Sequence, residues 1–164
     1  MQVVASHLQD EAVRRSPGPD ADQFARSAFN RYYYATFLEV KAKLATLRPE
    51  WANEMQHAAM PEILRGKVKT ALTAGRKQAS RADDHKVAQL CQDACRAAAE
   101  LAELLDEGRV TRVTADYHPD IPVDFVHSPD FELNKVGVKV ARHGPQRGRV
   151  QMHLIGNAWR QIHA

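Results

Sequence analysis

The segment "RSAFNRYYYATFLEV", residues 26–40, places three tyrosines in succession directly after Arg31. Its composition and flanking residues favour a helix, in which successive side chains point about 100° apart. Tyr32, Tyr33 and Tyr34 therefore cannot all face the same core. This helix must contact more than one neighbour, and the identity of those neighbours decides the fold.

The helix is expected to start at Asp20 or Asp22, after the turn-forming "SPGPD", and to end near Leu47, before "RPEW". Its apolar residues form two faces. The first face recurs at spacings of three and four and consists of Phe29, Tyr33, Phe37, Val40, Leu44 and Leu47. The second face lies almost opposite and consists of Phe24, Ala28, Arg31, Ala35, Leu38 and Ala42.

A surface helix usually has one apolar face, so the second face needs a covering partner. One interpretation is a homodimer or a partner protein, with Tyr32 and Tyr34 at the rim, where an apolar ring with a polar tip is well suited. The interface would then consist of Phe24, Ala28, Arg31, Tyr32, Ala35 and Leu38. The other interpretation places the helix centrally, with both faces in the core of one bundle.

Three further helices are expected. The first covers residues 2–15, and the second begins near Pro61 and ends near Gly75. The third follows the start signal formed by Ser80 and Asp83, and Gly108 is expected to end it. Residues 51–60 are ambiguous.

After residue 118 the helical spacing of apolar residues gives way to proline-rich and then alternating sequence. A proline-rich connector is expected first, and then a β-hairpin whose inward residues alternate as Val136, Val138, Val140 and Val150, Met152, Leu154. The predicted fold is therefore mainly α, a four-helix up-down bundle with a C-terminal β-hairpin. The predicted division is 1–118 for the helical bundle and 119–164 for the connector and the basic hairpin.

Charge is unevenly distributed along the chain. The net charge is +3, but no acidic residue follows Glu132, and the six cations after it give this tail +6 and the remainder −3. Such asymmetry indicates either a surface for a polyanion or a basic tail that docks on an acidic body. For a polyanion such as RNA, the predicted contacts are Tyr34, Lys139, Arg142, Arg149 and His153.

Other classes of protein are disfavoured. No apolar run reaches signal-peptide or membrane-span length, which predicts a cytoplasmic protein. Cys91 and Cys95, four residues apart, are expected to be reduced core residues. The histidines show no spacing typical of metal ligands, and the sequence predicts neither a metal nor a cofactor.

Three motifs together resemble the HEPN superfamily of small helical domains. "NRYYYATFLEVKAKL" resembles the family helix S-R-x-Y-Y-A-x-F-H, "QHAAMPEIL" resembles a His-led segment, and "TRVTADY" resembles R-x-x-A-D-Y, all within residues 20–118. The resemblance implies a four-helix bundle, frequent dimerisation through the motif helix, and roles in toxin–antitoxin or anti-phage systems. Many members are metal-independent endoribonucleases that use an arginine and a nearby histidine.

The sequence departs from that pattern at Leu38, which stands where the family helix has its histidine and cannot transfer a proton. Arg112 and His118, with five residues between them, form a second candidate pair, and Arg31 is the third catalytic candidate. The histidine would move protons, and the arginines would stabilise charge on the phosphate. Alternatively, Arg112 is structural and pairs with Asp116, or the pair only binds.

Three functions follow from these patterns. The first is a dimeric HEPN-type ribonuclease acting as a toxin or a defence component. The second is a non-catalytic HEPN subunit that dimerises or binds a partner such as a nucleotidyltransferase-like antitoxin. The third is a nucleic-acid-binding protein whose basic hairpin makes the contacts.

Overall fold

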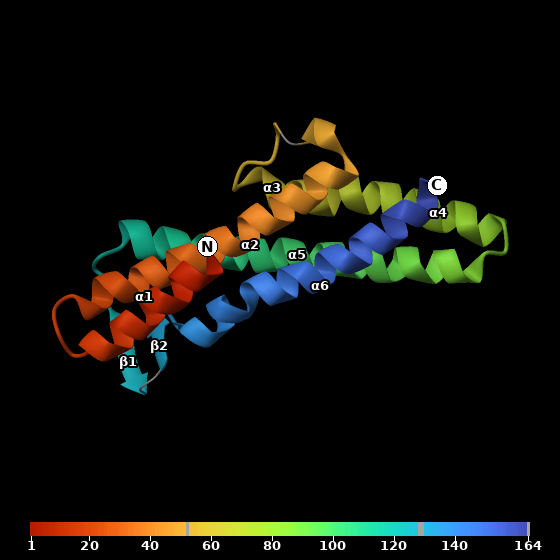
Figure 1. The fold of residues 1–164 in the computed structure, drawn as a ribbon. Helices are drawn as coiled ribbons and strands as arrows, with labels where there is room; N and C mark the ends of the chain where they lie inside the picture. The colour runs from red at the N-terminus through yellow and green to blue at the C-terminus, as the bar shows by residue number, and fades with distance from the viewer. Residues whose placement is uncertain (52, 128–129, 164) are drawn as a thin grey trace. The chain divides into compact units, whose positions relative to one another are not determined.

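A computed structural model describes residues 1–51, 53–127 and 130–163 of the chain. The fold is mainly helical and includes a small three-stranded antiparallel sheet. Among the described residues, no helix has the length and apolar character needed to cross a membrane. Along the chain (Figure 1) the elements are α1 (Gln2–Arg15), α2 (Ala21–Leu47), a 3-10 turn (Pro49–Trp51), α3 (Ala59–Ile63), a π-helical segment (Leu64–Val68), α4 (Lys69–Arg81), α5 (His85–Tyr117), β1 (Val123–His127), β2 (Asp130–Leu133), β3 (Val136–Gly137) and α6 (Val138–Ile162).

The chain forms two compact units, each built from two separate stretches of sequence. The first unit comprises residues 1–38 and 107–146, and the second comprises residues 39–106 and 147–164. The long helices α2, α5 and α6 each contribute residues to both units. Residue 118, the predicted domain boundary, lies inside the first unit.

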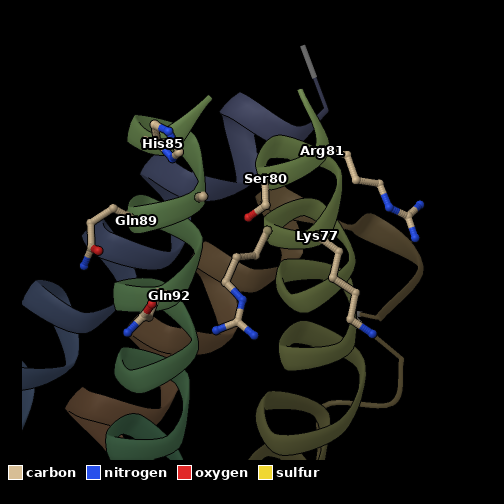
Figure 2. Close-up of a pocket in the computed structure, with 8 residues that line it drawn as sticks. Lys77, Ser80, Arg81, His85, Gln89 and Gln92 are labelled. Carbon is tan, nitrogen blue, oxygen red and sulfur yellow. The ribbon is translucent and has the colours of Figure 1, made fainter. Parts of the chain in front are cut away.

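In the second unit, α4 and the first turns of α5 lie side by side (Figure 2) and are joined by a short turn (Figure 1). The Val87 N–H donates a hydrogen bond of 3.0 Å to Oδ1 of Asp84, which caps the start of α5. Asp83 adopts a left-handed backbone conformation, with φ of 54°. The predicted start signal at Ser80 and Asp83 is therefore close in position, but Asp84 provides the cap.

Two glycines that were expected to end helices lie inside them. α4 continues past Gly75, and α5 continues past Gly108. A Cβ at Gly75 would lie 2.5 Å from Cγ2 of Ile162, and a Cβ at Gly108 would lie 2.9 Å from Cδ2 of Tyr33. Each glycine allows a side chain from another helix to approach the backbone closely, so the expectation of helix ends at these positions is wrong.

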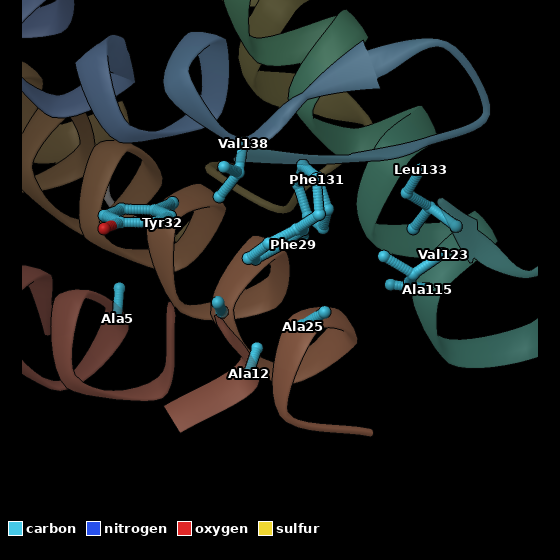
Figure 3. Packing of buried hydrophobic residues seen from close by; sticks show 11 residues of the cluster. Ala5, Ala12, Ala25, Phe29, Tyr32, Ala115, Val123, Phe131, Leu133 and Val138 are labelled. Atoms are coloured by element: carbon cyan, nitrogen blue, oxygen red, sulfur yellow. The ribbon is translucent and has the colours of Figure 1, made fainter. Parts of the chain in front are cut away.

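In the first unit, the first apolar face of α2 is buried as predicted. Phe29, Tyr33 and Phe37 are all 5% exposed or less, and Tyr33 stacks on Phe37 with ring centroids 6.0 Å apart. The Phe29 ring meets the edge of Phe131 of β2 at 5.7 Å (Figure 3). In the second unit, Val40 and Leu44 continue the buried face.

The second face of α2 is partly covered by α1, whose Ala5 and Ala12 share a buried cluster with Ala28 and Tyr32 (Figure 3). The Tyr32 hydroxyl donates a hydrogen bond of 2.8 Å to Oε1 of Gln9, and burial raises the pKa of Tyr32 above its usual value. The prediction that Ala28 and Tyr32 belong to a partner interface is therefore wrong, because the small side chains of α1 allow the chain's own first helix to cover them.

The sheet lies earlier in the chain than predicted. β1 pairs with β2 in an antiparallel register that places Val123 opposite Leu133, and β2 pairs with β3. Asn134 and Lys135 form the connection between β2 and β3 with φ values of 49° and 66°, which suits a tight two-residue hairpin turn. The segment expected to be an extended connector therefore contains two of the three strands.

The predicted hairpin over residues 136–154 is wrong, because residues from Val138 onward form α6. Val140 and Val150, which the hairpin would have turned inward, are half exposed. The buried and half-buried side of α6 instead follows alternating steps of three and four, typical of a helix: Val138, Ala141, Pro145, Gly148, Met152, Ile155, Trp159 and Ile162. Gly144 and Pro145 resembled a turn in the sequence but lie within this helix.

The side chain of Arg26 connects α2 to the end of α5. Its Nε donates to Oδ2 of Asp22 at 2.5 Å, and the other oxygen of Asp22 accepts the Val123 N–H at 2.9 Å, where β1 begins. The two terminal nitrogens of Arg26 donate to four backbone carbonyls, those of Thr114, Ala115, His118 and Ile121. These include carbonyls at the end of α5 that have no partner within the helix.

Replacing Gly75 by alanine is expected to lower the free energy of unfolding by up to about 2 kcal/mol. The overlap with Ile162 should cost about 1–3 kcal/mol, and the gain in helix propensity from alanine offsets roughly 1 kcal/mol of this cost. Gly66→Ala is the matched control: no atom lies within 4 Å of its added Cβ, so it should be neutral or stabilising. Urea unfolding of both variants measures the difference, and equal effects would contradict the close approach at Gly75.

Replacing Arg26 by alanine is expected to destabilise the protein by roughly 2–4 kcal/mol. The variant leaves the Asp22 carboxylate and the backbone carbonyls without the donor that Arg26 provides. The Arg26 side chain is only 12% exposed. Arg96→Ala is the control, because Arg96 forms an exposed ion pair with Asp93 and its loss should cost about 0.5 kcal/mol or less. Thermal and urea unfolding give both values, and similar losses in the two variants would refute the special role of Arg26.

Candidate functional site

The candidate site lies in the first unit, where α2 and α5 each present a pair of residues four positions apart. Asn30 and Tyr34 come from α2, and Arg112 and Asp116 come from α5, with Tyr117 at the end of α5. Residues four apart share one face of a helix. We call these five residues the Arg112 cluster.

Asp116 joins the two helices of the cluster. Its Oδ1 accepts a hydrogen bond of 2.5 Å from Nδ2 of Asn30, and its Oδ2 lies 2.8 Å from Nε of Arg112. The contact with Arg112 is an ion pair whose N–H is not aligned for a hydrogen bond. One carboxylate therefore fixes both the amide of α2 and the guanidinium of α5.

The guanidinium of Arg112 also lies near two aromatic rings. Its central carbon is 6.0 Å from the ring centroid of Tyr34 and 5.7 Å from that of Tyr117. Both distances are within the range of cation–π attraction. Tyr117 is 66% exposed, so the cluster presents an aromatic ring to solvent beside a fixed positive charge.

The two predicted catalytic partners face different carboxylates. Arg112 pairs with Asp116, as the structural interpretation of this arginine predicted. His118 lies just beyond α5, and its half-exposed ring places Nδ1 3.9 Å from Oδ1 of Asp120. The carbonyl of His118 accepts a hydrogen bond from Arg26, which holds its backbone in place. The structure therefore places Arg112 and His118 in separate pairs.

Arg31, the third catalytic candidate, is exposed on α2. Among the described residues it forms no hydrogen bond or ion pair, so its charge is uncompensated. Leu38, on the same face of the helix, is 44% exposed, and Ala35 is half buried. Phe24 is half buried, and the central guanidinium carbon of Arg15 lies 4.5 Å from the centroid of the Phe24 ring. The part of the predicted interface that remains open is therefore formed by Arg31, Ala35 and Leu38.

The other predicted RNA contacts are exposed on α6 instead of on a hairpin. In the first unit, Lys139 pairs with Asp130 at 2.5 Å, and Arg142 is exposed. In the second unit, Arg149 pairs with Glu39 at 3.1 Å, and His153 is exposed. Within the described ranges, no three His, Cys, Asp or Glu side chains are grouped so that they could hold a metal ion.

The sequence analysis missed the part played by Asn30. The signal was present, because Asn30 stands four residues before Tyr34 just as Arg112 stands four before Asp116. Spacing on each helix could indicate which residues share a face, but not that the two faces meet. That contact depends on how α2 and α5 pack.

Comparison of the chain with protein-family models, with curated proteins and with solved structures finds no match in any of the three. The resemblance of the tyrosine-bearing helix to HEPN domains therefore stays a prediction that depends on the motif residues alone.

A double-mutant cycle between Asn30→Ala and Asp116→Ala should give a coupling energy of about 0.5–1.5 kcal/mol in the free energy of unfolding. The hydrogen bond between these two side chains is the physical reason, and urea unfolding of the two single variants and the double variant measures it. Effects that add within about 0.3 kcal/mol would show that the contact does not join α2 to α5.

Proposed function

We propose that the protein binds single-stranded RNA at the Arg112 cluster without cleaving it. The observation that carries this proposal is the exposed ring of Tyr117, held beside the Arg112 guanidinium with Tyr34 on another side. RNA bases stack on aromatic side chains, and this contact is worth about 1–3 kcal/mol per base. The exposed ring suits a base, and the neighbouring phosphate needs a cation that is not already paired with a carboxylate.

Two exposed cations of the first unit support phosphate binding. Arg31 and Arg142 have no ion-pair partner among the described residues, whereas Arg26 and Arg112 are paired with carboxylates. An uncompensated exposed arginine can bind a phosphate without first breaking an ion pair. Such contacts would make affinity fall as salt concentration rises.

The geometry favours binding over catalysis. A ribonuclease of the Arg–His type needs both groups at one phosphate, with the histidine free to exchange protons. Here Arg112 is neutralised by Asp116, His118 lies near Asp120, and Leu38 stands where the HEPN motif has its histidine. A HEPN-like four-helix arrangement and a role in a toxin–antitoxin or defence system are part of this proposal, and they depend on the motif resemblance.

A partner interface on α2 is the second candidate function. Leu38 is a large apolar side chain that is 44% exposed, beside Ala35 and the unpaired Arg31. Burial of Leu38 against a second copy of the chain or against a partner protein would remove this apolar surface from water. Sedimentation of the wild type and of Leu38→Glu tests this candidate. If Leu38 lies in an interface, the wild type should sediment as an assembly and the variant should dissociate.

Tyr117→Ala is expected to weaken binding of a fluorescein-labelled 12-nucleotide single-stranded RNA by roughly five- to a hundredfold, the equivalent of about 1–3 kcal/mol. Fluorescence anisotropy in EDTA at low salt measures the affinity. Tyr117→Phe keeps the ring and should bind nearly as the wild type does. Val110→Ala, an exposed site on the same helix, is the control for general effects. Equal affinity of Tyr117→Ala and wild type would refute the proposal.

The same mixtures, separated on a denaturing gel, should contain intact RNA after long incubation in EDTA, because Arg112 is paired with Asp116 whereas His118 lies beside Asp120. Metal-independent cleavage by the wild type that disappears in His118→Ala would refute the binding proposal and show that the protein is a ribonuclease that uses His118. Cleavage that persists in His118→Ala would remove this histidine from the mechanism.

A further inference from the structure

A hollow of about 550 Å³ lies in the second unit, between the end of α4 and the start of α5. Its volume is within the range of about 300–1,000 Å³ that is usual for small-molecule sites. None of the residues that line it is acidic, and three of them are cations of α4: Arg76, Lys77 and Arg81. Figure 2 shows the Ser80 hydroxyl on the side of α4 that faces α5 and Gln92 in front of α5, while Lys77 and Arg81 extend outward from α4, away from α5.

The charge of these three cations is uncompensated. Among the described residues, Arg76, Lys77 and Arg81 form no ion pair, although Arg65 and Lys67 of the same unit each pair with a carboxylate. Of the acidic residues nearby in the sequence, Asp83 does not line the hollow, and Asp84 and Asp93 have other partners. Asp84 caps α5, and Asp93 accepts from Gln89 and from Arg96.

The lining therefore fits an anion that also carries hydroxyl groups. Arginine and lysine bind phosphate by charge-assisted hydrogen bonds. The Ser80 hydroxyl and the Gln92 amide both donate and accept hydrogen bonds, which suits the hydroxyls of a small polar molecule. No aromatic ring lines the hollow, so a nucleobase would find no stacking surface.

The volume of the hollow favours a phosphate ester over free phosphate as the ligand. A water molecule takes about 30 Å³ of liquid volume, so a lone phosphate would leave most of the hollow to solvent. We propose that the hollow between α4 and α5 binds a small phosphorylated sugar or polyol, with its hydroxyls toward Ser80 and Gln92. Its phosphate would lie on Arg76, and the flexible side chains of Lys77 and Arg81 would turn inward from the edge of the hollow to contact it. This site is separate from the Arg112 cluster, so each proposal can fail without the other.

The test measures binding of glucose 6-phosphate to the full chain by calorimetry and by shifts of backbone amide resonances. Glucose and inorganic phosphate serve as partial ligands. The ester is expected to bind more tightly than either and to shift amides at residues 76–92. The double variant Lys77→Gln/Arg81→Gln should bind it at least roughly tenfold more weakly, because two charge-assisted contacts are lost.

The matched control is Lys41→Gln/Lys43→Gln, which removes the same charge from the second unit but lies outside the hollow. It should retain wild-type affinity, and melting temperatures show whether each variant is folded. Equal binding by both double variants would overturn the proposal. It would also fail if only the 12-nucleotide RNA, and none of the small phosphates, shifted amides at residues 76–92.

Discussion

Arg26 joins α2 to the end of α5 and to the start of β1 through a single guanidinium. The last four carbonyls of a helix have no partner within it, and at the end of α5 those of Thr114 and Ala115 belong to buried residues. Arg26 donates to both of these carbonyls, and Asp22 balances its charge and accepts the first N–H of β1. The position of the sheet in the first unit, and hence the packing of Phe131 on Phe29, depends on this arrangement.

Small residues determine which helices can approach one another. Ala5 and Ala12 of α1 share a buried cluster with Ala28 and Tyr32, and this contact covers part of the second apolar face of α2. The core interpretation of that face is therefore confirmed for Ala28, and the partner interpretation stays a prediction for the rest. Arg31 and Leu38 of this face are exposed, and Ala35 is half buried.

The distribution of ion pairs divides the cations into structural and available groups. Arg112 is held by Asp116 and two tyrosines, and therefore serves better as a fixed charge beside an aromatic surface than as a catalytic group. Arg31 in the first unit, and Arg76, Lys77 and Arg81 in the second, have no such partner among the residues that the structure describes. An anion that met one of these available cations would not have to break an ion pair first.

The sequence by itself determined the long tyrosine-bearing helix and its buried face from Phe29 to Leu44, because these depend on spacing within one helix. For the same reason it offered the pairing of Arg112 with Asp116, but only as one of several interpretations. It could not determine that Gly75 and Gly108 are contact points and not helix ends, because a glycine has the same local signal in both roles. Alternating valines on both sides of Gly144 and Pro145 favoured a hairpin, whereas the spacing of three and four from Val138 to Ile162 favoured a helix. The segment forms the helix α6, because the longer pattern gives one side of that helix that can pack against the rest of the protein. Only the tertiary structure brought Asn30 to Asp116 and Arg26 to the end of α5, because each of these depends on contacts between segments that are distant in the sequence.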